Sequence, residues 1–355
     1  MKILINGNFL NRNLTGIERF AWEICHALDS MLTEKDDFSI LVSSNARVFP
    51  EFKKIKIVIP KVQLKSFVKW DLSIFKKECK KLNALGLNFS TTAPFGKKCG
   101  FAFIHDIYAA SFPEDFVSFR DKLVRLYCLM CYRNIAKNAL KVFTVSGFSK
   151  ELIAKKYSVK EENICVIPNG WEHFAKIESD TSIMEKHPEL KKGSFYFTLG
   201  SLSRRKNLKW IVEYSKKHPE EIFAISGKAI SGLVPPELEE LKTLKNIVLL
   251  GYVSDGEVKC LMENCRAFIF PSYYEGFGIP PLEALSCGTS AVVAKSACLP
   301  EIYGNTVHYI DPFSTDISLS ELLKEQVENP SKVLEKFTYK NAAELLLEEI
   351  RKHSN

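Results

Sequence analysis

The chain has 355 residues, of which 46% are hydrophobic, and a formal net charge of +7. This length and apolar content exclude a disordered chain and predict two domains with separate cores. The charge indicates an anionic partner, which could be a phosphorylated substrate, an acidic membrane surface or nucleic acid.

No apolar stretch reaches the roughly 18 residues that a membrane span needs. The opening segment MKILINGNF lacks the apolar run of a signal peptide. We therefore expect a cytoplasmic protein whose ten cysteines are reduced thiols, with Cys128 and Cys131 as core residues rather than zinc ligands.

The first predicted element is a short buried strand at residues 2–5, which a Gly/Asn-rich turn connects to a helical pattern over residues 17–32. Further strands are predicted within residues 38–44, 55–60, 85–90, 101–106 and 141–146, and then within residues 195–201, 221–227, 246–252, 267–272, 289–295 and 308–312. Helix-like segments separate many of these runs. Such alternation predicts an α/β fold of two doubly wound, Rossmann-like domains with parallel sheets.

The boundary between the two strand series lies in a polar, charged and aperiodic stretch. We predict a first domain over residues 1–170, a linker over 171–193, a second domain over 194–332 and a C-terminal helical segment over 333–355. The last segment has an amphipathic pattern and must pack on another element, which could be the first domain. Open parallel sheets bind ligands at the carboxyl ends of their strands.

The segment 61–82 mixes seven lysines with aromatic and aliphatic residues. It could form a basic amphipathic surface that docks on a membrane. The alternative is a helix packed on the core with a solvated lysine face.

A Gly-rich loop between a buried strand and a helix that begins with proline occupies residues 270–285. The free N–H groups of a helix start bind phosphate, and glycines at 276 and 278 let the backbone approach a ligand closely. Two carboxylates, Glu275 and Glu283, bracket this loop and could accept hydrogen bonds from sugar hydroxyls. The alternative is a turn with a capping or solvent-facing glutamate.

A second loop places two cations, Arg205 and Lys206, after the strand predicted within 195–201. The planar fork of the arginine and the point charge of the lysine suit a diphosphate. In the first predicted domain, His105 and Asp106 end a buried strand, and Gly16 precedes the first helix. The spacing around Gly16 does not give the GxGxxG pattern of a dinucleotide fold.

The stretch EGFGIPPLE from Glu275 to Glu283 resembles the hallmark EGFGxPxxE of family four of the retaining glycosyltransferases with the GT-B fold. The resemblance continues through residues 284–288 and 299–302. It implies that Glu275 lies against the transferred sugar and that Glu283 binds the nucleotide ribose. It also implies backbone contacts to the diphosphate and sugar along the loop of Gly276, Phe277, Gly278 and Ile279.

The same resemblance assigns roles elsewhere. It implies that Arg205 and Lys206 stabilise the leaving diphosphate in place of a metal ion, so that neither a metal nor a cofactor is expected. His105 would contact the 6-hydroxyl of the donor sugar and support the transition state, whereas Asp106 could orient the imidazole or hold the acceptor. The remaining implied contacts are a loop at Gly16 that closes over the diphosphate, Asn169 on the donor, and the backbone of Tyr252, Val253 and Lys228 near the base.

These expectations describe a metal-independent hexosyltransferase that transfers a sugar from a nucleoside diphosphate to a glycan or lipid-linked acceptor with retention of configuration. Resemblance to bacterial polysaccharide mannosyltransferases favours GDP-mannose, with UDP- or dTDP-sugars as alternatives. Peripheral contact with the cytoplasmic face of the inner membrane is an open alternative, and nucleic-acid binding is not expected. Competing hypotheses are a non-catalytic sugar-nucleotide-binding homologue and a phosphorylase or epimerase of related fold.

Overall fold

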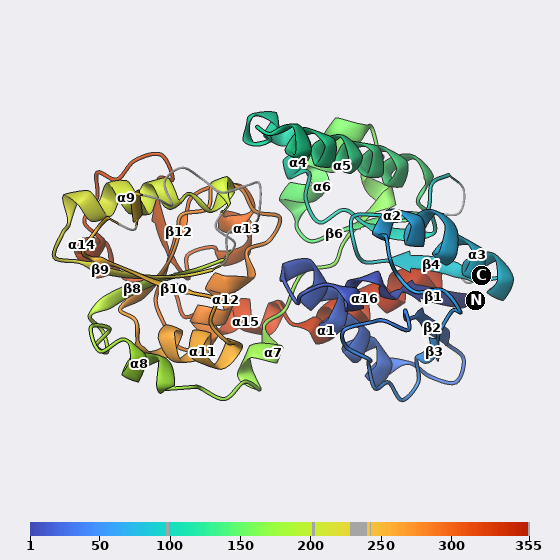
Figure 1. The fold of residues 1–355 in the computed structure, drawn as a ribbon, viewed down its shortest axis with the longest axis horizontal. Helices are drawn as coiled ribbons and strands as arrows, with labels where there is room; N and C mark the ends of the chain where they lie inside the picture. The colour runs from blue at the N-terminus through green and yellow to red at the C-terminus, as the bar shows by residue number, and fades with distance from the viewer. Residues whose placement is uncertain (97–98, 201–202, 228–239, 242, 354–355) are drawn as a thin grey trace. The chain divides into compact units, whose positions relative to one another are not determined.

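The computed structural model describes residues 1–96, 99–200, 203–227, 240–241 and 243–353 (Figure 1). It divides into two compact units. The first unit comprises Met1–Pro113, Lys122–Gly170 and Thr338–Asn355, and the second comprises Glu114–Asp121 and Trp171–Phe337. Each unit contains one parallel sheet flanked by helices, which confirms the predicted α/β fold.

The sheet of the first unit has the order β3-β2-β1-β4-β5-β6-β7. Its strands are β1 (Lys2–Asn6), β2 (Asp37–Leu41), β3 (Lys56–Val58), β4 (Leu85–Asn88), β5 (Phe101–Phe103), β6 (Lys141–Thr144) and β7 (Ile164–Val166). Consecutive residues of β1, Ile3 to Ile5, are all buried because both faces of the sheet are covered.

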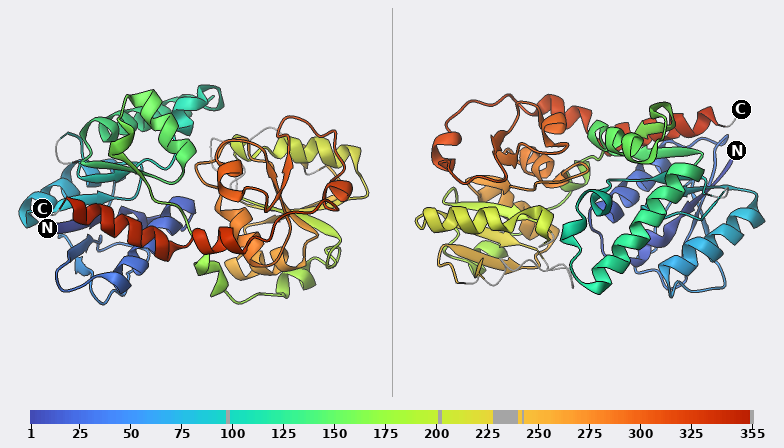
Figure 2. Two further views of the ribbon diagram at one scale, coloured as in Figure 1. Left: turned by 180° about the vertical axis from the view of Figure 1, so that it is seen from behind. Right: turned by 90° about the horizontal axis from the view of Figure 1, so that it is seen from above.

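The helices up to β7 include short 3-10 turns and one π-helical segment. They are η1 (Gly7–Asn11), α1 (Gly16–Met31), α2 (Phe67–Lys69), η2 (Trp70–Phe75), α3 (Lys76–Leu82), α4 (Tyr108–Ser111), η3 (Pro113–Asp115), α5 (Phe119–Asn138), α6 (Gly147–Tyr157) and η4 (Glu161–Asn163). The final helix, α16 (Tyr339–Lys352), completes this unit by packing against α1 (Figure 2).

The sheet of the second unit has the order β10-β9-β8-β11-β12-β13. Its strands are β8 (Phe195–Leu199), β9 (Ile222–Ser226), β10 (Ile247–Gly251), β11 (Ala267–Phe270), β12 (Ala291–Ala294) and β13 (His308–Ile310). The chain order reverses between the neighbours β8 and β11, and this switch point is where open α/β sheets bind ligands.

The helices of the second unit cover both faces of this sheet. Their described members are α7 (Glu172–Ala175), α8 (Ser182–Lys186), η5 (Arg204–Lys206), α9 (Leu208–Lys217), α11 (Asp255–Asn264), α12 (Ile279–Ser286), α13 (Leu299–Tyr303), α14 (Leu319–Leu322) and α15 (Ser331–Lys336). The side chains of Trp210 and Tyr214 on α9 are buried in a core with Phe223 of β9 and Ile269 of β11.

Two predicted segments differ in the structure. Residues 171–193 are part of the second unit rather than a separate linker, because the Lys259 amino group on α11 donates to the carbonyls of Phe174 and Ile177 at 3.3 and 2.7 Å. The C-terminal helical segment predicted over residues 333–355 contains two helices, because α15 ends at Lys336 and α16 begins at Tyr339. The Thr338 side chain caps α16 by accepting from the Asn341 N–H at 3.0 Å, so the helix begins anew there.

The segment 61–82 packs on the core of the first unit. Trp70 and Phe75 are buried in a cluster with Leu4 and Leu41 from two strands, while its lysines are mostly exposed. The aromatic side chains of Trp70 and Phe75 therefore face inward, as in the core-packed alternative, whereas Val62 and Val68 are exposed. Within the described part of the chain, no helix combines the length and the apolar character needed to cross a membrane.

Candidate functional site

Two loops meet at the carboxyl edge of the second sheet. One follows β8 and carries Arg205 and Lys206, and the other follows β11 and carries Glu275. The Tyr273 N–H donates to the Arg205 carbonyl at 3.1 Å, and the Asn207 amide donates to the Pro271 carbonyl at 3.1 Å. Because β8 and β11 are adjacent, these bonds join residues about 70 positions apart into one surface.

Glu275 is buried and binds both predicted cations. Its Oε2 lies 2.9 Å from Arg205 Nη1, and its Oε1 lies 2.6 Å from Lys206 Nζ. Burial opposes the charge of this carboxyl, but the Arg205 and Lys206 charges outweigh burial and hold the pKa of Glu275 below its usual value. The three side chains therefore form an ionised cluster at neutral pH, with one net positive charge.

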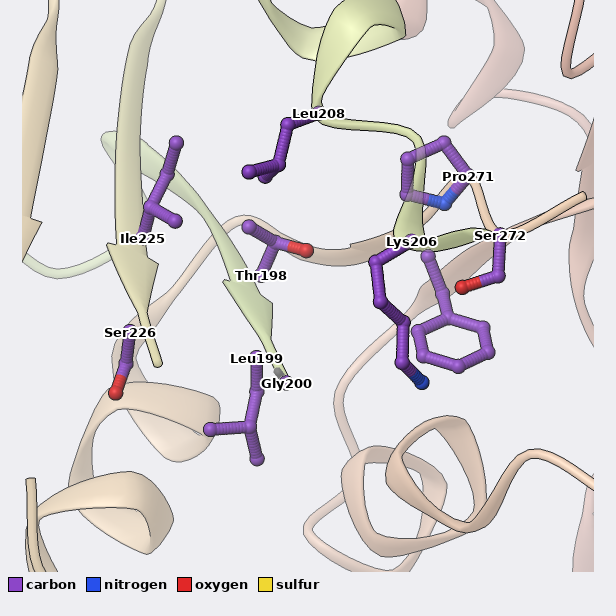
Figure 3. A pocket seen from close by; sticks show the side chains of 10 residues that line it. Thr198, Leu199, Gly200, Lys206, Leu208, Ile225, Ser226, Pro271 and Ser272 are labelled. Atoms are coloured by element: carbon purple, nitrogen blue, oxygen red, sulfur yellow. The ribbon is translucent and has the colours of Figure 1, made fainter. Parts of the chain in front are cut away.

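Lys206 also borders a small pocket at the ends of β8, β9 and β11 (Figure 3). Its Nζ lies 4.6 Å from the centre of the Phe270 ring. Gly200 at the end of β8 has a φ of +150°, and a Cβ there would lie 3.3 Å from Lys206 Cε. The absence of a side chain at this glycine lets Lys206 pass close to the strand end.

Two side chains, Cys298 and Tyr303, are hydrogen-bonded to the loop between Glu275 and α12. The Cys298 thiol lies 3.2 Å from the Glu275 carbonyl oxygen and 3.3 Å from that of Phe277, and the Tyr303 hydroxyl donates to the Gly278 carbonyl. Gly278 has a φ of +88°, which favours glycine, and immediately precedes Ile279, the first residue of α12. The helix start predicted to bind phosphate thus follows a turn whose carbonyls are hydrogen-bonded. Gly276 lies in the same turn.

Glu283 lies on α12 and is paired with a residue that the sequence did not single out. Its Oε1 lies 3.0 Å from Nε2 of His173, and both side chains are buried. His173 belongs to α7, within the stretch predicted to be a linker. Neither its spacing nor its periodicity signals this contact, which depends on how α7 packs on the second unit.

The residues predicted near the base follow β10. Tyr252 is 83% exposed, whereas Val253 is buried. Val253 therefore packs in the core, whereas Tyr252 faces solvent. Lys228 lies outside the described residues.

In the first unit, His105 lies at the end of β5 and is buried. Its Nε2 lies 2.7 Å from the Phe89 carbonyl oxygen, and its ring is stacked 5.5 Å from that of Phe103. Burial lowers the pKa of His105. The Asp106 carboxylate accepts the Tyr108 N–H at 2.9 Å and so begins the turn into α4.

Gly16 is the first residue of α1, and a Cβ there would meet no atom within 4 Å. Packing therefore does not require glycine at this position. The neighbouring Glu18 is buried, accepts the Thr15 hydroxyl, and lies 3.7 Å from Arg12 Nη1. Asn169 is buried next to the last residue of this part of the unit. Within the described residues, no cluster of three or more His, Cys, Asp or Glu side chains could hold a metal ion.

Comparison with known proteins shows similarity to glycosyltransferases. Residues 179–344 match the family model described as glycosyl transferases group 1. The O-antigen chain mannosyltransferase RfbU of Salmonella typhimurium is 26% identical over 212 residues, which cover 59% of this chain and 56% of the relative. The O-antigen chain mannosyltransferase B of Escherichia coli is 27% identical over 196 residues, covering 53% and 51%.

A third relative, the UDP-Gal:alpha-D-GlcNAc-diphosphoundecaprenol alpha-1,3-galactosyltransferase of Escherichia coli, is 28% identical over 203 residues, which cover 54% of this chain and 51% of the relative. The chain thus spans about half the length of these curated relatives.

Similar solved structures extend over nearly the whole chain. Sucrose-phosphate synthase from Thermosynechococcus elongatus has a TM-score of 0.73 at 14% identity and covers 99% of this chain and 98% of its own. WaaG, a glycosyltransferase involved in lipopolysaccharide biosynthesis, has a TM-score of 0.62 at 16% identity, covering 97% and 93%. At these identities the likeness establishes the GT-B fold.

Proposed function

Because the chain has the GT-B fold, resembles polysaccharide mannosyltransferases and carries the glycosyl transferases group 1 domain over residues 179–344, we propose that it transfers a sugar from a nucleoside-diphosphate donor. The observation that carries this proposal is the cluster of Glu275 with Arg205 and Lys206 at the switch point of the second sheet. A diphosphate at the start of α12 would meet two cations that are already oriented.

The proposed transfer breaks the bond between C1 of the donor sugar and the diphosphate oxygen. Arg205 and Lys206 stabilise the charge that develops on the departing diphosphate. The acceptor hydroxyl forms its bond to C1 on the same face of the sugar, and its proton passes to the diphosphate. Configuration is retained, and the products are the glycoside and the nucleoside diphosphate.

The two cations would perform the task that a metal ion performs in other phosphate sites. Glu275 would face the sugar, Glu283 the ribose, and the backbone from Gly276 to Ile279 the diphosphate. We therefore expect that EDTA leaves the transfer rate unchanged, and an EDTA-dependent loss that Mg²⁺ or Mn²⁺ restores would contradict this part of the proposal.

We propose GDP-mannose as the donor, supported by the two relatives named as O-antigen chain mannosyltransferases. The galactosyltransferase relative, whose name specifies UDP-Gal, supports a UDP-sugar as the second candidate. The relatives' names also support a glycan or lipid-linked acceptor in surface polysaccharide synthesis, which would place the enzyme in the cytoplasm at the inner membrane.

The proposal is tested by measuring both nucleoside-diphosphate binding and the rate of sugar transfer. Thermal shifts with GDP, UDP and dTDP should single out one base, since the bound diphosphate stabilises the folded protein. With the matching sugar donor, Arg205→Ala/Lys206→Ala should lower turnover by roughly 10²-fold or more, because preorganised charge at the leaving group is lost. Lys191→Ala/Lys192→Ala removes the same charge from an exposed loop of the second unit and should not change turnover.

Several outcomes would overturn the proposal. Undiminished turnover in Arg205→Ala/Lys206→Ala would remove these residues from the mechanism. Nucleotide binding without transfer or donor hydrolysis under any condition would favour a non-catalytic homologue. Formation of sugar phosphate would instead favour a phosphorylase.

A further inference from the structure

Helix α5 exposes a line of large apolar side chains. Leu123, Leu126 and Met130 are 52%, 55% and 46% exposed. The helix nevertheless packs well, because Cys131, Tyr132 and Ile135 on its other side are buried in the first unit. The exposed apolar side chains are therefore not part of the face by which α5 packs on the first unit. Figure 1 shows α5 at the outside of its unit.

Basic side chains share this outer side. Positions 122, 126, 130, 133 and 137 follow one another at steps of three and four residues, which places them along one side of a helix. Leu126 and Met130 lie in the middle of this series, with the exposed cations Lys122 before them and Arg133 and Lys137 after them. Residues 122–138 contain four basic residues and no acidic one. This side therefore combines apolar side chains with charges that are all positive.

The neighbouring helix α6 extends the positive charge. The ring of Tyr157 at its end lies 6.1 Å from that of Tyr132 on α5, so the last turn of α6 contacts α5. Lys155 and Lys156 in the last turn of α6 are exposed.

We propose that this outer side of α5, defined by Lys122, Leu123, Leu126, Met130, Arg133 and Lys137, binds the surface of an anionic phospholipid bilayer. A helix with apolar residues in line and cations beside them lies in the membrane interface, with its apolar side chains among the acyl chains and its cations at the headgroups. The absence of acidic residues over 122–138 favours a negatively charged surface.

The inference deepens the proposed function, since a lipid-linked acceptor would be presented at such a surface. It replaces the segment 61–82 as the membrane contact, because Trp70 and Phe75 of that segment are already used in the core. Binding to lipid does not itself require transfer, so the two proposals can fail separately.

The experiment is co-sedimentation of the full chain with phosphatidylcholine vesicles that contain either no anionic lipid or about one-third phosphatidylglycerol. We expect sedimentation with the anionic vesicles and little with the neutral ones. Leu123→Ser/Leu126→Ser/Met130→Ser and Lys122→Gln/Arg133→Gln/Lys137→Gln should each lower the partition coefficient at least about tenfold, since both apolar burial and charge contribute.

Matched controls use other exposed residues. Val48→Ser/Phe49→Ser/Val62→Ser alters three apolar side chains of the first unit that are 43%, 48% and 50% exposed, and Lys191→Gln/Lys192→Gln removes charge elsewhere. Both should sediment as the wild type does. Circular dichroism and Tm establish that each variant folds, and Arg205→Ala/Lys206→Ala should lose turnover while it keeps vesicle binding.

The proposal is overturned if the wild type ignores anionic vesicles, if the α5 variants still bind them, or if the apolar control abolishes binding. A wild-type dimer that becomes monomeric on the leucine and methionine changes, without vesicle binding, would assign this side of α5 to a second copy of the chain and equally overturn it.

Discussion

At the scale of single residues, Glu275 determines the electrostatics of the candidate site. The carboxylate is buried, and it holds Arg205 and Lys206 at 2.9 and 2.6 Å. Removing one member of such a cluster leaves the other charges in a partly buried position without their partner. The charge state of Glu275 therefore affects both stability and chemistry.

The lowered pKa of Glu275 predicts a pH-dependent contribution to stability. A carboxyl whose folded pKa lies below its unfolded value of about 4.3 stabilises the fold fully above that pH and loses the effect as pH falls through the folded pKa. The difference in unfolding free energy between the wild type and Glu275→Gln should thus be constant near neutrality and shrink below about pH 4. Urea denaturation across this range measures it. A difference that does not depend on pH would contradict the assignment.

His173 provides a test of how Glu283 is held. His173→Gln can keep a donor to the carboxylate, whereas His173→Leu cannot. We expect His173→Leu to raise the KM for the donor about tenfold or more with a smaller change in kcat, as for loss of a group that positions a binding residue. His173→Gln should recover much of the affinity.

The mechanism of the His173 effect can be isolated with Glu283→Gln. If His173 acts through Glu283, His173→Leu should add little to the effect of Glu283→Gln, since coupled residues are not additive. Equal effects in both backgrounds would show that His173 acts elsewhere.

The sequence predicted which residues gather at this edge of the second sheet better than how their side chains are held. Glu275, Arg205 and Lys206 each follow a strand, and adjacent parallel strands bring such residues to one edge. Direct pairing of Glu275 with both cations was not predicted, because it depends on side-chain placement. The contact between His173 and Glu283 depends on tertiary packing of a short helix, which leaves no periodic signal.

At the scale of elements, the turn into α12 combines two constraints at Gly278. Its φ is +88°, and a Cβ would lie 2.7 Å from Leu299 Cδ2 on α13. Gly288, after the same helix, has a φ of +74° and no atom within 4 Å of a Cβ. Alanine substitutions at the two glycines therefore separate the cost of a left-handed backbone from the cost of a clash with Leu299.

We predict that Gly278→Ala destabilises the protein by about 2–4 kcal/mol, which adds a forced side-chain shift to the cost of the left-handed backbone. Gly288→Ala should cost only about 1 kcal/mol, from the backbone alone. Chemical denaturation measures both. Equal losses would show that Leu299 yields without cost.

Strands were predicted more reliably than helix ends. Each predicted apolar run overlaps a strand, because most of these parallel strands are covered on both faces and are continuously hydrophobic. β7 was not predicted as a strand. The break between α15 and α16 depends on capping by Thr338, which the continuous amphipathic pattern conceals.

At the scale of the whole molecule, the C-terminal helix belongs to the unit formed by the beginning of the chain. On α16, Leu346 is fully buried against the first unit, whereas its neighbour Leu345 is 45% exposed. Arg351 of the same helix pairs with Asp36 at 2.7 Å. The stability of the first unit should therefore depend on residues at both ends of the sequence.

We predict that Leu346→Ala destabilises the first unit by about 2–5 kcal/mol through the cavity that it leaves, whereas Leu345→Ala changes stability by less than about 0.5 kcal/mol. The nucleoside diphosphate that binds should raise the Tm of the second unit, which carries Arg205, Lys206 and Glu283. Calorimetry with and without this nucleotide can then assign the transitions. If the units unfold separately, Leu346→Ala lowers only the transition that the nucleotide leaves unchanged.

A single transition lowered by the mutation and raised by the nucleotide would instead show that the two units unfold as one cooperative structure, because stabilising either unit then stabilises both.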